Sequence, residues 1–406
     1  MKIGIESKGF DGWGGGVDFI RHVASCLELA DENNELKKHI LLAQNDCFFH
    51  LKKQIIPFRK LLAQLAHREP LRWMPWKGFD EHYLRKTFSD FHSYQLDAPG
   101  NRLSSHFAYA KKQNIDVLIP CISPPPENYL LPWVGYIYDF QHKYLPEFFT
   151  ERDIKERDNA FRQMLNRAEH VIVNAQSVKK DADKFIGNYN AKIHVLPFSP
   201  NPREEWLDEN RDLSRQYGIT KPYFIICNQF WIHKDHSTAF RAFSDFLKKV
   251  GKKYQLVCTG DTSDSRFPDY YNSLLDLIRE LNIEDDIKIV GHIPKLDQIS
   301  LLKQSSAVIQ PTLFEGGPGG GAAYDAIALG KPLIVSDIPV NLEIEKDDRV
   351  FFFRSKDVGD LVLKMQEASQ FVFNAVDNDV LRDKGKRRKL ACGRVLLGVI
   401  NEAAAK

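Results

Sequence analysis

Residues 314–332 read FEGGPGGGAAYDAIALGKP, and this stretch carries the strongest signal in the chain. It follows an apolar run, Ala307–Gln310, and leads into a helical pattern. Glycine leaves backbone N–H groups unobstructed, and a helix N-terminus adds the favourable end of its dipole, so the layout suits phosphate. The acids Glu315 and Asp325 would repel phosphate, so we expect them to accept hydrogen bonds from sugar or ribose hydroxyls. The stretch therefore favours a nucleotide sugar over the alternative, a simple flexible turn.

Length and composition indicate two domains. The chain has 406 residues, of which 43% are hydrophobic and 12% aromatic, so each half can bury a core of its own. The net charge is +2, which by itself argues neither for nor against nucleic acid, and we predict no nucleic-acid partner. A basic stretch, Leu51–Leu62, with Trp73 and Trp76 further on, leaves contact with a membrane surface open, and an ordinary solvated face is the alternative.

The six cysteines are scattered without any short C-x-x-C spacing. This pattern indicates neither a zinc site nor a disulfide framework, so we predict no metal site. The N-terminus begins with the strand pattern Lys2–Glu6 rather than with a signal peptide, and no apolar run reaches the ~20 residues that span a bilayer. We therefore expect a cytoplasmic protein, with a location at the inner face of the cell membrane left open.

Short apolar runs alternate with amphipathic helical stretches, as in parallel sheets built from βαβ units. The proline-rich, charged stretch 197–221 suits a linker with a short helix, which predicts domains 1–200 and 201–406, with the last segment a candidate to pack back on the first domain. The expected strands are Lys2–Glu6, His39–Ala43, Asp116–Pro120, Val134–Tyr138, His170–Val173, Lys192–Leu196, Tyr223–Cys227, Tyr254–Cys258, Ile287–Val290 and Ala307–Gln310. The expected helices include Val17–Ala30, Ser237–Val250 and Tyr270–Leu281.

The region around Glu315 and Asp325 resembles the retaining glycosyltransferases of family 4, also described as glycosyl transferases group 1. Their C-terminal half carries an E-x7-E pattern followed by a helix and a Gly-x-Pro turn, which here is Gly330-Lys331-Pro332. In this chain nine residues separate the two acids, and the second acid is Asp. The resemblance implies the GT-B fold, an α/β fold in which two doubly wound, Rossmann-like domains face a central cleft. The N-terminal domain would hold the acceptor and the C-terminal domain the nucleotide sugar.

The resemblance also implies roles for residues in the C-terminal half. Lys234, which follows the strand Tyr223–Cys227, would stabilise the departing diphosphate, and His233 and Asn228 would lie beside it at the rim. His292 and Ile293 occupy the place where the family surrounds the nucleobase, although a plain turn explains them equally well. Glu315 is assigned to catalysis, and the remaining donor-binding residues are Gly316, Gly317, Gly319, Gly320 and Asp325.

Two segments of the N-terminal half contribute further candidates. Gly15 and Gly16 resemble the family's N-terminal glycine pair, which implies donor binding because it lets the donor phosphates and the acceptor approach the sheet closely. A dinucleotide fingerprint with Asp46 as its ribose acid is an alternative. Relatives often have a His-Asp pair where Tyr138-Asp139 stands here. His142 is then the nearest group able to orient the sugar or the acceptor hydroxyl, and Asp139 could accept from an acceptor hydroxyl; a surface loop role for His142 is the alternative.

Taken together, the sequence predicts a retaining, metal-independent glycosyltransferase of the hexosyltransferase type. It would move a sugar from a nucleoside diphosphate sugar to an acceptor hydroxyl on a saccharide or lipid-linked saccharide, in polysaccharide or glycolipid assembly. No cofactor is expected. The alternatives are a nucleotide-sugar epimerase or a phosphorylase on the same fold, and a catalytically inactive two-domain binding module, which the acid spacing and Tyr138 keep open.

Overall fold

The computed structural model describes residues 1–10, 14–42, 55, 57–59, 61–62, 65, 94–97, 103–264, 266–370 and 374–405. Trp73, Trp76 and Asp46 lie outside these residues, as does half of the basic stretch Leu51–Leu62, so the roles predicted there stay predictions. The described chain forms two compact units. Among the described residues, the N-terminal unit contains those of Met1–Phe58 and Pro75–Phe198 and those from Arg387 onward. The C-terminal unit contains those of Arg59–Met74 and Ser199–Lys386.

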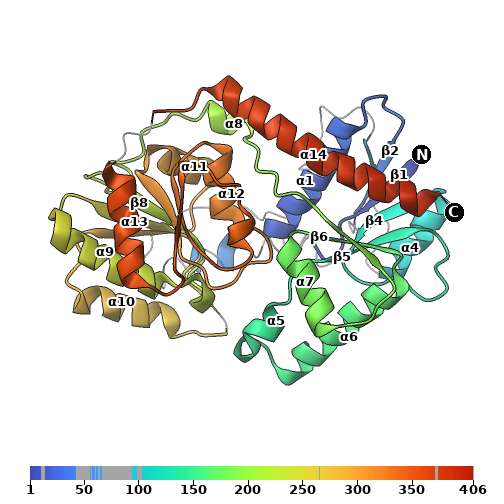
Figure 1. Cartoon of the computed structure of the whole chain (residues 1–406), viewed down its shortest axis with the longest axis horizontal. Coiled ribbons are helices and arrows are strands. Elements are labelled where there is room, and N and C mark those ends of the chain that lie inside the picture. The colour runs from blue at the N-terminus through green and yellow to red at the C-terminus, as the bar shows by residue number, and fades with distance from the viewer. Residues whose placement is uncertain are drawn as a thin grey trace. The chain divides into compact units, whose positions relative to one another are not determined.

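Within the described residues, the N-terminal unit is built on a parallel sheet of seven strands in the order β3-β2-β1-β4-β5-β6-β7. Strands β1, β2, β4, β5 and β6 of this sheet are labelled in Figure 1. The strands alternate with helices along the chain, as the sequence predicts. The strands are β1 (Lys2–Glu6), β2 (Lys37–Leu41), β3 (Tyr94–Asp97), β4 (Val117–Cys121), β5 (Trp133–Ile137), β6 (His170–Val173) and β7 (Lys192–Val195). The helices are α1 (Gly14–Ala30), α4 (Leu103–Lys112), α5 (Gln141–Tyr144), η1 (Pro146–Phe148), α6 (Glu151–Arg167) and α7 (Gln176–Phe185).

The last helix, α14 (Asn378–Ala404), begins in the C-terminal unit and ends in the N-terminal unit. Its second half packs with α1 against strands β1, β2, β4, β5 and β6 in one continuous apolar core. On α14 this core takes in Cys392, Leu396, Val399, Ile400 and Ala403. A second, smaller core lies against the same sheet. It includes Phe107 and Ala110 of α4 and Leu41 of β2.

The described residues of the C-terminal unit form a second parallel sheet, of six strands, in the order β10-β9-β8-β11-β12-β13. The strands are β8 (Tyr223–Cys227), β9 (Gln255–Thr259), β10 (Ile287–Gly291), β11 (Ala307–Gln310), β12 (Leu333–Ser336) and β13 (Val350–Phe353). The helices are α8 (Glu204–Leu207), η2 (Ile232–Lys234), α9 (His236–Val250), α10 (Tyr270–Glu280), α11 (Lys295–Gln304), α12 (Gly320–Ala328), η3 (Asn341–Glu343) and α13 (Val358–Gln370). Helices α9, α10 and α13 share one core with the sheet.

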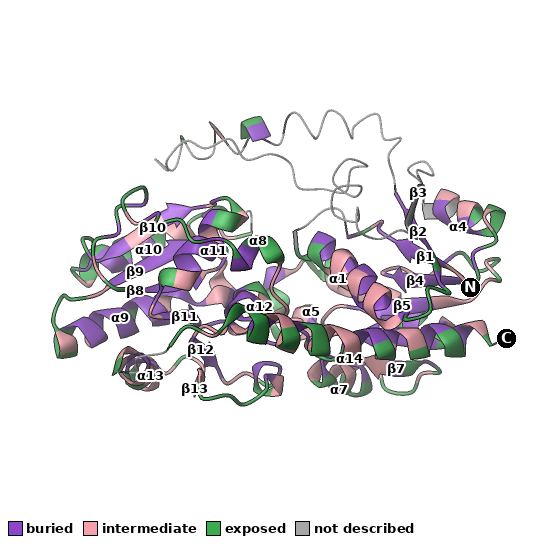
Figure 2. Ribbon diagram, turned by 90° about the horizontal axis from the view of Figure 1, so that it is seen from above, coloured by how far each residue is buried: buried purple, intermediate pink, exposed green. Residues whose placement is uncertain are grey.

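Most strand residues of both sheets are buried, as parallel strands covered on both faces should be (Figure 2). All the strands expected from the sequence are found, and their ends differ from the prediction by two residues at most. Both sheets reverse their strand order once, between β1 and β4 and between β8 and β11. In open α/β sheets ligands bind at the carboxyl ends of the strands beside such a reversal, so the loops after β8 and β11 are the first place to look.

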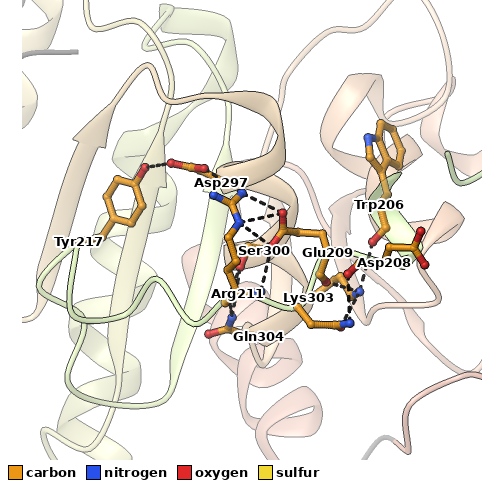
Figure 3. Close-up of polar contacts among 10 residues, drawn as sticks. Trp206, Asp208, Glu209, Arg211, Tyr217, Asp297, Ser300, Lys303 and Gln304 are labelled. Carbon is orange, nitrogen blue, oxygen red and sulfur yellow. Dashed lines mark hydrogen bonds and ion pairs between the residues drawn. The ribbon is translucent and has the colours of Figure 1, made fainter. Parts of the chain in front are cut away.

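The segment that follows Ser199 is fastened to helix α11 by polar contacts (Figure 3). The ammonium of Lys303 donates to the carbonyl oxygen of Leu207, the last residue of α8, at 3.0 Å. It also donates to that of Glu209, just after the helix, at 2.5 Å. Arg211 donates to Glu209 and, at 3.1 Å, to Asp297, which also accepts from the hydroxyl of Tyr217. These contacts fix the position of α11, whose first turn carries two side chains of the site described next.

No helix in the described part of the chain is long and apolar enough to cross a membrane.

Candidate active site

The glycine-rich turn between β11 and α12 requires glycine at two positions. Gly319 and Gly320 adopt φ angles of 63° and 60°, which L side chains rarely tolerate. A Cβ added to Gly319 would come within 2.1 Å of the Cβ of Ala323, and one added to Gly320 would come within 2.9 Å of the carboxylate of Glu315. Gly321 meets nothing within 4 Å. Gly316 and Gly317 lie in the same turn, where Gly317 O accepts from Gly320 N at 3.4 Å.

Two fully buried amides hold this turn in place. Gln310, the last residue of β11, donates from Nε2 to Gly319 O at 2.9 Å and to Glu315 Oε1 at 3.1 Å. Its Oε1 accepts from Nδ2 of Asn228, just after β8, at 2.6 Å. Asn341 accepts from Gly319 N at 2.8 Å. A phosphate bound here would therefore use N–H groups further along the first turn of α12, because that of Gly319 is engaged.

The sequence analysis identified Asn228 but missed Gln310 and Asn341. An amide that ends an otherwise apolar strand is a signal that could have identified Gln310. Asn341 sits in a short 3₁₀ helix after β12 and carries no comparable pattern, so only the fold reveals its contact with the turn.

Lys234 and Glu315 form a close ion pair at the reversal of the sheet. Lys234 ends η2 after β8, and its Nζ lies 2.5 Å from Oε1 of Glu315; the side chains are only 13% and 11% exposed. The two loops are also joined through the backbone, because Leu313 N donates to His233 O at 2.8 Å. A single, well-positioned ammonium thus lies beside the glycine turn, where it can stabilise negative charge on a ligand.

Asp325, in the second turn of α12, forms a second ion pair with the first residue of α11. Its buried carboxylate accepts from the ammonium of Lys295 and from Gln298 Nε2, the latter at 3.5 Å. His292 and Ile293 lie in the short connection between β10 and Lys295, so they are near this pair along the chain. Ile293 is buried and His292 is half-buried. A ribose hydroxyl that reached Asp325 would share the carboxylate with Lys295.

His233 is held neutral by its surroundings. Burial, and then the charges of Lys234 and Arg266, lower the pKa of His233 to about 2. Its side chain is therefore uncharged at neutral pH, and the positive charge beside Glu315 comes from Lys234. With so low a pKa, the ring of His233 is not in the imidazolium form at neutral pH and cannot act as a general acid. It can contribute by packing and hydrogen bonding instead.

Because of the neighbouring His236, we expect the folded chain to lose stability in acid. His236 is fully buried, it stacks on Phe230 at 4.2 Å between ring centroids, and burial lowers its pKa to about 3. Below about pH 6.5 this histidine binds a proton in the unfolded chain but not in the folded chain. The free energy of unfolding therefore falls as the pH drops toward the pKa of His236 in the folded chain, by up to about 1.4 kcal/mol per pH unit for each such histidine. Urea midpoints measured at about pH 7.5 and pH 5 should differ less for His236→Gln than for the wild-type chain. An unchanged difference would contradict this cause.

The structure places His142 inside the N-terminal unit. Its ring is 1% exposed, Nε2 contacts Asp158 Oδ1 at 2.9 Å, and the rings of Phe140, Phe149 and Phe161 surround it. Burial lowers the pKa of His142. His142 is thus a packed residue of the unit rather than the surface loop residue of the alternative, and its contact with a sugar stays a prediction.

Asp139, Gly15 and Gly16 lie at the carboxyl ends of the N-terminal strands. Asp139 Oδ1 accepts from Gln141 N and from Arg157 Nη2, both at 2.9 Å, so it orders the start of α5 and neutralises Arg157. Gly15 and Gly16 fall in the first turn of α1, after β1. These three residues belong to the N-terminal unit, whereas the group around Lys234 belongs to the C-terminal unit.

A family model covers the region that holds this group. Residues 209–370 match the model of glycosyl transferases group 1. This stretch of the C-terminal unit is therefore similar to group 1 glycosyltransferases. No curated protein matches the chain.

Solved structures extend the likeness over both units. Sucrose-phosphate synthase from Thermosynechococcus elongatus covers the whole chain at 13% identity, with a TM-score of 0.59 and 96% of its own length matched. HepE of Anabaena, solved in complex with UDP-glucose, covers 100% of this chain and 98% of its own at 14% identity and a TM-score of 0.58. The lipopolysaccharide outer core galactosyltransferase WaaB covers 99% of each chain at 16% identity and a TM-score of 0.57. At such identities the likeness shows the fold alone: the chain has the GT-B fold, as the sequence predicts.

Proposed function

We propose that the protein is a retaining, metal-independent hexosyltransferase that moves a sugar from a nucleoside diphosphate sugar to an acceptor hydroxyl. The observation that carries this proposal is the Lys234–Glu315 pair beside the positive-φ glycines, at the strand-order reversal of the stretch that is similar to group 1 glycosyltransferases. The proposal includes a saccharide or lipid-linked saccharide as acceptor and a role in polysaccharide or glycolipid assembly. It also includes a cytoplasmic location at the inner face of the membrane.

Breaking the anomeric C–O bond leaves positive charge on the sugar and negative charge on the departing diphosphate. The ammonium of Lys234 is placed to stabilise that diphosphate, together with N–H groups of the first turn of α12 beyond Gly319. Glu315 keeps the ammonium in position and can accept a hydrogen bond from a sugar hydroxyl. These groups supply the charge that a metal supplies in other transferases, so the mechanism proposed here uses no cofactor.

The remaining groups supply specificity. Asp325, held by Lys295, would accept from ribose hydroxyls, and the backbone at His292 and Ile293 would border the base. The bound UDP-glucose of HepE and the galactosyltransferase activity of WaaB support a UDP-hexose as the first donor to test. Gly15 and Gly16 would contribute to donor binding by letting the phosphates approach the sheet closely, and Asp139 would accept from an acceptor hydroxyl.

The test is thermal stabilisation across UDP, GDP, ADP, dTDP and their common sugars. A ligand bound only by the folded state at about 100-fold above its Kd should raise Tm by roughly 5–10 °C. We expect a selective shift with one nucleotide, and its loss in Asp325→Asn. The matched control is Asp245→Asn, an exposed ion-paired carboxylate on α9 that should leave the shift unchanged.

A shift with no nucleotide at all would overturn the donor site and favour the inactive binding module. A shift with nucleotide sugars that comes with epimer formation, detected by NMR without any acceptor, would favour the epimerase instead.

A further inference from the structure

Three side chains capable of ligating a metal meet between α1 and α14 in the N-terminal unit. His22 and Cys26 lie one helical turn apart on α1, and Cys392 comes from α14. Their ligating atoms all lie within 4.8 Å of one another, and His22 Nε2 is 3.4 Å from Cys26 Sγ. The two thiols are buried and the imidazole is half-buried, so the cluster has one side open to solvent.

A glycine brings the two helices together at this point. A Cβ on Gly393 would lie 2.1 Å from the carbonyl oxygen of Cys26 and 2.8 Å from the Cβ of Ala30. The backbones can therefore touch only because residue 393 has no side chain. The contact sits within the apolar core that α1 and α14 share, so the positions of the two thiols are fixed by packing.

We infer that His22, Cys26 and Cys392 form a binding site for a thiophilic divalent cation of the Zn²⁺ class, with solvent as the fourth ligand. Two thiolates and an imidazole are the donors that tetrahedral zinc prefers, at about 2.3 Å for sulfur and 2.0–2.1 Å for nitrogen. Such a tetrahedron separates its sulfur and nitrogen donors by about 3.6 Å, close to the observed His22–Cys26 distance. Binding forms two metal–sulfur bonds and one metal–nitrogen bond, and the two thiol protons pass to solvent.

Lys389 lies one turn before Cys392 on α14 and interacts electrostatically with Cys26. A divalent cation bound by two thiolates forms a neutral centre, so it is not repelled by Lys389. The site would fasten the end of α14 to α1 within the N-terminal unit, and it is independent of the proposed transferase activity.

A second cluster in the same unit provides an internal comparison. His170, His194 and Glu402 also lie within metal-ligating reach, but Glu402 is bound to Lys192 at 2.7 Å and the group contains no sulfur. A cation there would have to displace the ammonium and could form no metal–thiolate bond. The two clusters are therefore distinguishable by spectroscopy.

The experiment is a Co²⁺ titration of the full chain, purified metal-free in a phosphine reductant. We expect near-ultraviolet thiolate-to-cobalt charge transfer and the strong visible bands of tetrahedral cobalt, saturating at one ion per chain and displaced by Zn²⁺. The signal should weaken in His22→Gln and disappear in Cys26→Ser/Cys392→Ser. His194→Gln, in the sulfur-free cluster, should retain it.

Zn²⁺ should also raise the Tm of the wild-type chain but not that of the double variant, whose fold in the absence of metal is checked by circular dichroism. Absence of any thiolate band in the reduced wild-type chain would overturn the site. So would a band that survives in the double variant.

Discussion

Lys234→Ala should lower kcat by about 10²–10³, with a much smaller change in KM. The ammonium of Lys234 lies beside the glycine turn and is paired with Glu315, and both side chains are nearly buried. Its charge matters most when the diphosphate departs, because only then does the full negative charge develop. Turnover is measured as nucleoside diphosphate release with the donor chosen by the thermal-shift panel.

Lys248→Ala is the matched control, since Lys248 is an exposed lysine on α9 with a carboxylate partner of its own. It should leave kcat and KM unchanged. Glu315→Gln adds a second comparison, because it keeps the shape of the side chain but removes the charge that positions Lys234. If Lys234→Ala turned over donor as fast as the control, the ammonium would have no part in the chemistry and the proposed mechanism would be wrong.

Gly320→Ala and Gly321→Ala should differ sharply although they are neighbours in one helix turn. At position 320 a Cβ would meet the Glu315 carboxylate at 2.9 Å and would be forced into a left-handed backbone that costs roughly 1–2 kcal/mol. The carboxylate would have to move, and Lys234 would lose its partner. We expect turnover to fall by at least about tenfold, which corresponds to ~1.4 kcal/mol in the barrier.

Position 321 meets nothing within 4 Å and has no positive φ, so Gly321→Ala should keep both its urea midpoint and its turnover. Alanine there even favours the helix, by up to about 1 kcal/mol. Equal losses in the two variants would show that added bulk near the ligand, rather than displacement of Glu315, is responsible. A fully active Gly320→Ala would show that the position of Glu315 does not matter.

The sequence predicts the sheets well because buried parallel strands read as short apolar runs. His170–Val173 and Ala307–Gln310 match the structure at both ends. Helix starts are less exact: α1 begins at Gly14, three residues before the expected Val17, because glycines give no helical signal even where the backbone is helical. The strand β13 (Val350–Phe353) was not expected, although its apolar run is plain in the sequence.

Side-chain partners are harder to predict than elements. Lys234 and Glu315 could each be proposed from their place after a strand, but their pairing follows from the adjacency of β8 and β11, which the strand order determines. His142 shows the opposite case. Its place after β5 suggested the cleft, whereas in the structure its ring contacts Asp158 and Phe161.

The thiol cluster was missed for a physical reason. Spacing rules detect metal ligands that share one loop, and Cys26 and Cys392 stand near opposite ends of the chain. Only the packing of α14 on α1, which Gly393 permits, brings them together. The prediction that no metal site exists rested on spacing alone, and the cobalt titration now tests it.

The path of α14 has a consequence for how the molecule is made. Five residues of this helix, from Cys392 to Ala403, belong to the core of the N-terminal unit. During synthesis the sheet that contains β1 emerges first, yet its core has to wait for residues made after the entire C-terminal unit. The first domain to be translated is thus the last to be completed, and until then the apolar face of α1 that α14 later covers stays exposed to chaperones and proteases.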